Sequence, residues 1–244
     1  MALHGRHWTF RAIAPWLAIG ALAVAPVQAK PVYTSFDVAN AAGTFALGIN
    51  GDGTITGYYV DAENADHGFL RSADGTIMTF DVSGAAATVP VAVNKSGIVA
   101  GQYTDSGLVD HGFVRAADGM IANFDVKGAG NGGNEGTRTS AINAKSMIAG
   151  YDVDSNAVYH GYLRAKGGRI SRFDAPGSGT GPAQGTLVYA INGGGSLTGY
   201  FIDQDNALHG FLRTADGSVT PFDVSGAAGT SSYGINDTGS IAGS

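Results

Sequence analysis

The sequence predicts an all-β protein, a β-propeller of five blades whose last blade is shared between the N- and C-termini. Three observations predict this fold. A unit of about 44 residues recurs along the chain, each copy reads as four short strands joined by turns, and nothing after residue 29 has the periodicity of an amphipathic helix. A repeat of this length with four antiparallel strands is typical of one propeller blade.

The dipeptide Phe-Asp marks the repeat, and all length variation falls in one of its segments. An Asn follows the Phe after 14 residues in three copies and after 19 residues in two. From that Asn to the next His is always 17 residues, and from the His to the next Phe always 13. The variable segment therefore predicts a surface loop. The copies start near residues 36, 80, 124, 173 and 222, and the last copy is incomplete.

Within the first copy, four strands are expected in order. Residues 44–50 (TFALGIN) predict the innermost strand, because small side chains suit the crowded axis of a propeller. Residues 54–61 (TITGYYVD), 67–73 (HGFLRSA) and 76–82 (TIMTFDV) predict the next three. The turns between them carry Asn, Asp and Gly, which hairpins need at positive φ.

The ragged ends of the repeat suggest how the ring closes. Residues 32–38 (VYTSFDV) predict a lone fourth strand, and residues 232–244 (SYGINDTGSIAGS) predict a first strand and part of a second. Joining them would complete a shared fifth blade. That blade would lack its third strand, so either the closing blade is a reduced one or the sequence is a fragment.

The first 29 residues predict a secretory signal peptide, which leaves residues 30–244 as the repeat domain. Arg6 and Arg11 precede an apolar stretch, and small residues at Val27 and Ala29 precede the expected cleavage point. The apolar core is shorter than the roughly 20 residues of a transmembrane helix. We therefore expect a secreted or periplasmic protein with no membrane span after the signal is removed.

Charge and cysteine content exclude several classes of partner. Residues 30–244 hold 12 basic and 20 acidic residues, a net charge of −8, which argues against nucleic acid and against an anionic membrane surface. The chain has no cysteine, so its core must be held by packing alone.

The four histidines after residue 29 share one position in successive copies, with an Asp six residues before and another fourteen residues after. Catalytic groups are usually unique, whereas a group repeated in every blade meets the same local need. We predict structural His–Asp hydrogen bonds, with a ring of metal ligands as the alternative. The histidines are His67, His111, His160 and His209.

Two further repeated polar groups carry a structural and a functional interpretation. The arginine that ends each HGFLR-type motif (Arg71, Arg115, Arg164 and Arg213) predicts pairing with carboxylates, or else a face for acidic sugars. The acidic turn before each His fits turn chemistry, with a calcium site as the alternative.

Residues without a repeated counterpart are the better place to look for function. They concentrate in the Gly-rich loop at 127–139, where Asn134, Glu135 and Arg138 are the candidate ligand-binding residues. A solvated, flexible loop is the alternative. We predict no catalytic residue, no metal ligand and no cofactor, because the chain lacks cysteine and the usual nucleophile motifs.

The combination of FDV, GIN and HGFLR in this order resembles the bacterial HAF-repeat family of extracellular repeat proteins, over essentially all of residues 30–244. The His-Ala-Phe of that family reads His-Gly-Phe here, or His-Gly-Tyr at His160. The resemblance implies export and a repetitive β architecture, and supplies no catalytic residues.

These observations predict an exported repeat protein that acts as a non-catalytic binding or interaction module for an extracellular glycan or a protein ligand. An extracellular glycan-processing enzyme and a purely structural surface protein are the alternatives. A binder should have a face rich in Tyr or Arg, an enzyme a cluster of non-repeated carboxylates, and a structural protein neither.

Overall fold

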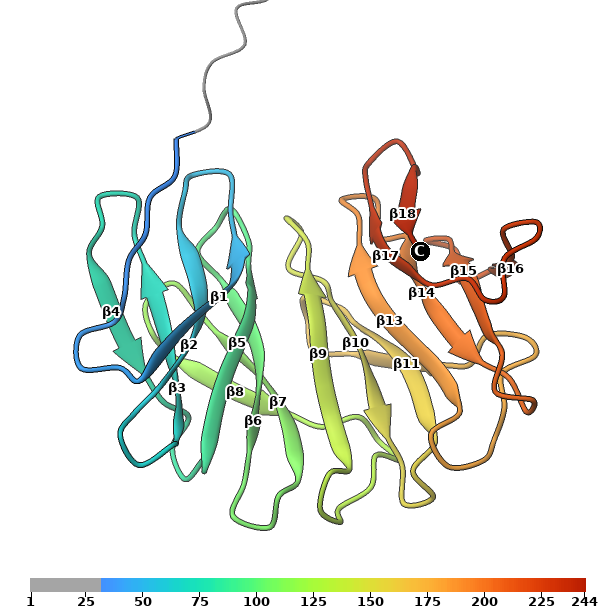
Figure 1. Ribbon diagram of the computed structural model, residues 1–244, viewed down its shortest axis with the longest axis horizontal. Coiled ribbons are helices and arrows are strands. Elements are labelled where there is room, and N and C mark those ends of the chain that lie inside the picture. The colour runs from blue at the N-terminus through green and yellow to red at the C-terminus, as the bar shows by residue number, and fades with distance from the viewer. Residues whose placement is uncertain (1–31) are drawn as a thin grey trace, which may run out of the picture. The chain divides into compact units, whose positions relative to one another are not determined.

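The computed structural model describes residues 32–244, and every regular element in that range is a β-strand. The predicted signal peptide, residues 1–29, lies outside the described residues. The chain divides into two compact units, Met1–Phe36 and Asp37–Ser244, and all strands belong to the second. Within that unit the repeats follow one another in chain order, from blue at the N-terminal end to red at the C-terminal end (Figure 1).

Each of the first four repeats forms one antiparallel four-stranded unit, as predicted, and we call each unit a blade. Blade 1 pairs β1 (Gly43–Ile49), β2 (Ile55–Val60), β3 (Asp66–Arg71) and β4 (Ile77–Phe80) in that order. The others repeat this pattern: β5 (Ala87–Val93), β6 (Val99–Thr104), β7 (Asp110–Arg115) and β8 (Ile121–Phe124) in blade 2; β9 (Gly136–Ile142), β10 (Ile148–Val153), β11 (Tyr159–Arg164) and β12 (Ile170–Phe173) in blade 3; β13 (Gly185–Ile191), β14 (Leu197–Ile202), β15 (Leu208–Arg213) and β16 (Val219–Phe222) in blade 4.

The fifth repeat forms only a hairpin, of β17 (Ser232–Ile235) and β18 (Ile241–Gly243). The fourth strand predicted at residues 32–38 is not formed. The fourth strand of every blade pairs with a third strand, and the hairpin provides none. Among residues 32–244 no pairing joins the first blade to the hairpin, so the sheets do not close.

The longer connections between blades are ordered and tie neighbouring blades together. The segment between β8 and β9 returns to the start of β7, where Asp110 and Gly136 form a parallel bridge. The segment between β12 and β13 does the same, with a bridge between Tyr159 and Gly185. Blades 2, 3 and 4 thus form one continuous twelve-stranded sheet.

The core lies between consecutive blades, and the HGFLR motif builds it. The aromatic residue of each motif is fully buried, and in blade 2 Phe113 meets Phe80 of blade 1 edge to face at 6.2 Å between ring centroids. The glycine before it leaves room for the blade's own Phe, since a Cβ on Gly112 would lie 2.4 Å from the ring of Phe124. Each blade therefore offers one aromatic ring to each neighbour.

One asparagine per repeat links each blade to the next. Its Oδ1 accepts backbone N–H groups of the turn after the first strand, and its Nδ2 donates to the backbone oxygen of the equivalent asparagine in the following repeat. We call this series the asparagine ladder. It runs Asn50 to Asn94 (3.1 Å), Asn94 to Asn143 (3.3 Å), Asn143 to Asn192 (3.0 Å) and Asn192 to Asn236 (3.2 Å).

The asparagine ladder predicts that substitution by Ala lowers the free energy of unfolding more at Asn143 than at Asn236. Asn143→Ala should lower the free energy of unfolding by about 2–3 kcal/mol, because a buried side chain loses the turn and the link to Asn192 together. Asn236→Ala, which caps an exposed turn and reaches no further asparagine among the described residues, should cost less than about 1 kcal/mol. Urea unfolding of both variants checks this. Equal losses would mean that the link between blades contributes nothing.

Candidate functional site

The repeated histidines form clamps within their blades, with the hydrogen bonds that the sequence predicts. The Nε2 of His67 lies 3.0 Å from Asp61 and its Nδ1 lies 2.9 Å from Asp81. The first Asp belongs to the turn before the third strand, and the second follows the fourth strand. The Nδ1 hydrogen bond recurs at His111, His160 and His209, at 2.9, 2.8 and 3.0 Å. The Nε2 hydrogen bond recurs at His111 and His209, whereas the Nε2 of His160 approaches Asp154 at 3.4 Å without forming one.

The turn carboxylates of the clamps are already engaged. The Oδ1 of Asp61 accepts the backbone N–H of Ala65, while its Oδ2 faces His67. The Oδ1 of Asp105 likewise accepts the amides of Gly107 and Val109. In the described part of the chain, no group of three or more His, Cys, Asp or Glu side chains is arranged to hold a metal ion. The geometry is that of a structural clamp that ties three segments of one blade.

The prediction that the repeated arginines pair with carboxylates was wrong for Arg115, Arg164 and Arg213. The guanidinium of Arg115 lies over the ring of Phe80 in the preceding blade, at 5.0 Å, and Arg164 and Arg213 cover Phe124 and Phe173 at 4.8 and 4.9 Å. The aromatic face takes the place of the expected carboxylate, because the motif directs the side chain between blades. These arginines therefore do not offer a row of charges for acidic sugars.

The structure brings Asn134, Glu135 and Arg138 to one place, at the end of the loop between blades 2 and 3. Arg138 donates from Nε to Asp110 at 2.7 Å and from Nη2 to the backbone oxygen of Asn134 at 2.9 Å. The carboxylate of Glu135 accepts the backbone N–H of Gly132 at 2.7 Å. The loop is thus held by its own polar groups rather than free in solvent.

The next long connection contains counterparts of two of these residues that the sequence comparison missed. Gln184 accepts the N–H of Gly181 as Glu135 accepts that of Gly132, at 3.0 Å. Ala183 has the positive φ of Asn134, 61° against 67°. Arg138 has no such counterpart, because the equivalent position on β13 is Leu187.

A bulge in the first strand of every repeat directs one variable side chain out of the regular pairing. The pairing skips one residue in each first strand, opposite a glycine of the second strand. A bulge of this kind re-aims a side chain. The frame around it is constant, whereas the skipped residue differs from blade to blade: Leu47, Val91, Ser140, Tyr189 and Tyr233.

Two of these bulge residues and Tyr200 of β14 form a tyrosine cluster. The rings of Tyr189 and Tyr200 stack at 5.3 Å, and Tyr233 meets them edge on at 5.2 and 6.2 Å. The hydroxyls of Tyr189 and Tyr200 lie 3.3 Å apart. Tyr233 is 50% exposed, so the cluster presents both an aromatic face and hydroxyl groups to solvent.

Tyr189 and Arg138 keep fixed protonation states at neutral pH, because the pKa of each is raised further above 7. Burial, then the hydrogen bond with Tyr200, raises the pKa of Tyr189, so its hydroxyl remains a donor. Burial lowers the pKa of Arg138, but hydrogen bonds with Asp110 and Tyr151 outweigh it and the net pKa is raised. Tyr151 lies opposite Arg138 in the sheet.

The sequence analysis missed Tyr189 and Tyr233 because it treated the first strand of each repeat as a strand of small side chains. The available signal was the position three residues before each repeat asparagine, where Leu, Val, Ser and two Tyr follow one another. A position that varies within a constant frame marks a surface that is free to acquire function.

The histidine clamps predict a pH dependence of stability. Hydrogen bonds to Asp61 and then Asp81 raise the pKa of His67, so its contribution is complete below the unfolded value near 6.5 and is lost as pH rises through the folded pKa. Hydrogen bonding lowers the pKa of Asp61, so its contribution is lost as pH falls through that folded pKa. Stability should therefore be greatest between about pH 4 and 6.5.

His67→Gln tests this assignment. The variant should lose about 1 kcal/mol of unfolding free energy at pH 5.5 and less at pH 8.5, measured by urea unfolding. An equal loss at the two pH values would contradict a charged clamp.

Comparisons with known proteins identify the fold and leave the family open. No protein-family model matches the chain, and no curated protein matches it. No helix among residues 32–244 is long and apolar enough to cross a membrane. A solved structure of a streptogramin B lyase is similar at 15% identity, with 84% of this chain and 69% of that chain covered and a TM-score of 0.51.

A second similar structure is a catalytically inactive variant of virginiamycin B lyase from Staphylococcus aureus with quinupristin. Identity is 14%, coverage is 86% of this chain and 72% of that chain, and the TM-score is 0.51. At this identity the likeness concerns the fold alone. Together with the four repeated four-stranded blades, it shows that the chain has an all-β, propeller-like fold.

Proposed function

We propose that this chain is an exported, non-catalytic binding module and that the tyrosine cluster binds an extracellular glycan. The observation that carries the proposal is the gathering of three tyrosines from two successive repeats, two of them at the variable bulge position of a constant frame. Sugar rings present apolar C–H faces and hydroxyls together, and tyrosine offers an apolar ring with a polar tip. The cluster supports the proposal because a face rich in Tyr is one of the two kinds of surface expected of a binder.

We also propose a five-bladed architecture and a family for this chain. Four blades and a hairpin that repeats the first half of a blade support a five-bladed propeller whose last blade is shared between the termini. The repeated motifs support membership of the HAF-repeat family, and with it a secreted or periplasmic location after removal of residues 1–29.

The pairing of the buried acids favours binding over catalysis. Asp110 and Asp152 are the buried carboxylates among residues 32–244, and each pairs with an arginine, at 2.7 Å to Arg138 and at 2.7 and 2.9 Å to Arg172. A glycan-processing enzyme needs one carboxyl group to give a proton and another to act as base or nucleophile. Two acids held by arginine side chains do not supply that pair.

Tyr233→Ala is the direct test of the proposed surface. The substitution should weaken binding of a glycan ligand by about tenfold or more, because it removes the most exposed ring of the cluster, with little change in stability. Binding is measured by calorimetry after a screen of polysaccharides by thermal shift. Leu47→Ala, at the same bulge position in blade 1 and 49% exposed, is the matched control.

A second variant tests the loop residues separately. The double substitution Asn134→Ala and Glu135→Gln copies the sister loop, in which Ala183 and Gln184 support the same geometry. The unfolding free energy should therefore change by less than about 1 kcal/mol, while glycan affinity should fall if these side chains touch the ligand. Unchanged affinity would show that the side chains of Asn134 and Glu135 do not contact the glycan, and that the tyrosine cluster binds it without them.

A further inference from the structure

Four exposed basic side chains lie in turns at one end of blades 2 and 3. We call them the basic patch: Lys95, Lys145, Lys166 and Arg169. Lys95 belongs to the turn between β5 and β6, Lys145 to the turn between β9 and β10, and the other two to the turn between β11 and β12. Within residues 32–244 none of the four forms an ion pair, although residues 30–244 carry a net charge of −8. Unpaired bases in neighbouring turns are therefore unexpected in this acidic chain.

Strand register and one hydrogen bond bring these turns together. In blade 3 the residues that flank the two turns pair in one row across the four strands, so both turns lie at the same end of the sheet, and blade 2 has the same register. Between the blades, the Nδ2 of Asn94 donates to the Oγ of Ser146 at 3.1 Å, which joins the turn of Lys95 to the turn of Lys145.

The turn of Lys166 packs against the turn of Lys145. In blade 2, a Cβ on Gly97 of the first turn would lie 3.6 Å from the Cβ of Ala117 in the outer turn. Blades 1 and 4 have the equivalent contact at 3.4 and 4.0 Å. Ser146 and Lys166 take these two positions in blade 3, so the two basic turns of that blade are in contact.

The basic patch arises where blade 3 departs from the other blades in its outer turn. Blades 1, 2 and 4 have an Asp there whose carboxylate accepts the backbone N–H two residues later: Asp74, Asp118 and Asp216. Blade 3 has Gly167 at that position, between Lys166 and Arg169, so the turn loses this hydrogen bond together with the negative charge. Both bases are exposed, and their side chains form no hydrogen bond within residues 32–244. A repeat that breaks its own rule without a gain in stability indicates a functional surface.

We propose that the basic patch binds an acidic polysaccharide, a chain of sugars that carry carboxylate groups. Lysine and arginine side chains bind carboxylates through charge-assisted hydrogen bonds. The equivalent turns of the flanking blades carry acids, as at Asp74 in blade 1 and Asp216 in blade 4. A lipid bilayer or a nucleic-acid duplex would bring these acids against its own negative charges. A single sugar chain follows the four bases alone.

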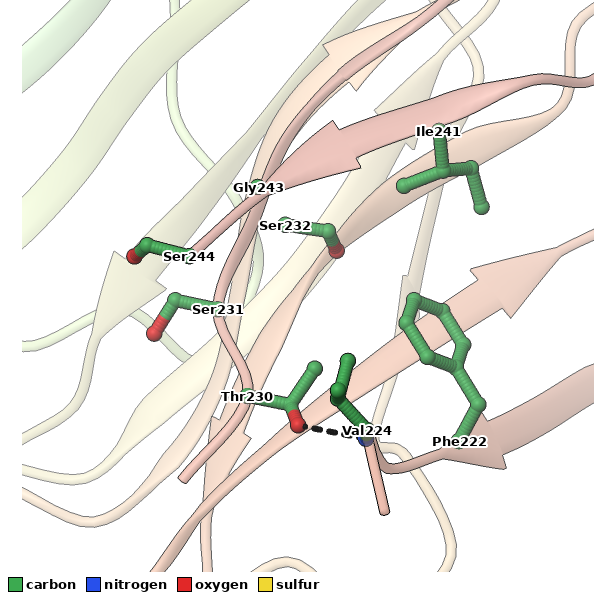
Figure 2. A pocket seen from close by; sticks show the side chains of 8 residues that line it. All are labelled: Phe222, Val224, Thr230, Ser231, Ser232, Ile241, Gly243 and Ser244. Atoms are coloured by element: carbon green, nitrogen blue, oxygen red, sulfur yellow. Dashed lines mark hydrogen bonds between the residues drawn. The ribbon is translucent and has the colours of Figure 1, made fainter. Parts of the chain in front are cut away.

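The basic patch is a second site, and it shares no residue with the tyrosine cluster. It also differs in chemistry from the pocket between the end of blade 4 and the final hairpin, which Figure 2 shows. The side chains of that pocket are apolar or carry a hydroxyl, such as Phe222, Ile241 and Thr230, and none of them is charged. An anionic polymer has no cationic partner there.

The test measures binding of polygalacturonate, alginate and hyaluronate to the whole chain by calorimetry. At least one of them should bind, with an affinity that falls as salt is added. A variant with Lys166→Ala, Gly167→Asp and Arg169→Thr copies the outer turn of blade 1. It should bind that polymer about tenfold more weakly or worse. Its thermal stability should be unchanged or higher, because the turn regains the hydrogen bond of the other blades.

Two controls separate the basic patch from net charge and from the tyrosine cluster. Lys127→Glu changes an exposed base beyond the other end of β8 and should leave the affinity unchanged, as should Tyr233→Ala. The proposal is overturned if none of the three polymers binds, or if the copied turn binds as tightly as the original. Loss of binding in Tyr233→Ala alone would assign the polymer to the tyrosine cluster instead. Tighter binding of phosphatidylglycerol vesicles or duplex DNA, lost in the copied turn, would overturn it in favour of that partner.

Discussion

The asparagine ladder is the constraint on which the rest of the structure depends. Apolar packing between blades is strong but not directional, so it does not by itself set how far one sheet slides past the next. A donor from each asparagine to the backbone of the next fixes that offset, and the same side chain closes its own turn. Two roles in one residue explain why Asn recurs in all five repeats while the turn residues after it change.

The strand bulges set where the repeat can vary. A glycine stands opposite each bulge, and a Cβ on it would lie 1.9–2.5 Å from a backbone oxygen at Gly57, Gly101, Gly150 and Gly199. Glycine is therefore required, whereas the bulged residue itself faces no such limit. Leu47 and Tyr233, both about half exposed, occupy the same position with different chemistry. The side chain at the bulge can therefore change, and with it the chemistry of this surface, while the strand pairing around the bulge is kept.

Much of the fold could be predicted from the sequence because most strand-forming interactions lie inside one repeat. The four strands, their turns and the His–Asp pairs follow from short spacings that recur. Interactions between repeats were not predictable in this way. Arg115 was expected to pair with an acid, yet its partner is Phe80 of the preceding blade. Glu135 looked unique because its counterpart in the next long connection is a different residue type, Gln184. Both side chains nevertheless accept the equivalent backbone hydrogen bond. The tyrosine cluster could not be predicted from a single repeat either, because Tyr200 and Tyr233 belong to different repeats.

Blade 3 shows how far such a frame tolerates change. An aromatic ring stacks on the clamp histidine in the other three blades, as Tyr103 does on His111, whereas blade 3 has the buried Asp152 at that position. A buried carboxylate is stable only when paired, and Arg172 on β12 pairs with it through two hydrogen bonds. The exchange stays inside one blade, because each blade contacts only its neighbours. A surface made by two adjacent repeats, such as the tyrosine cluster, can therefore change one half at a time while the asparagine ladder beneath it is preserved.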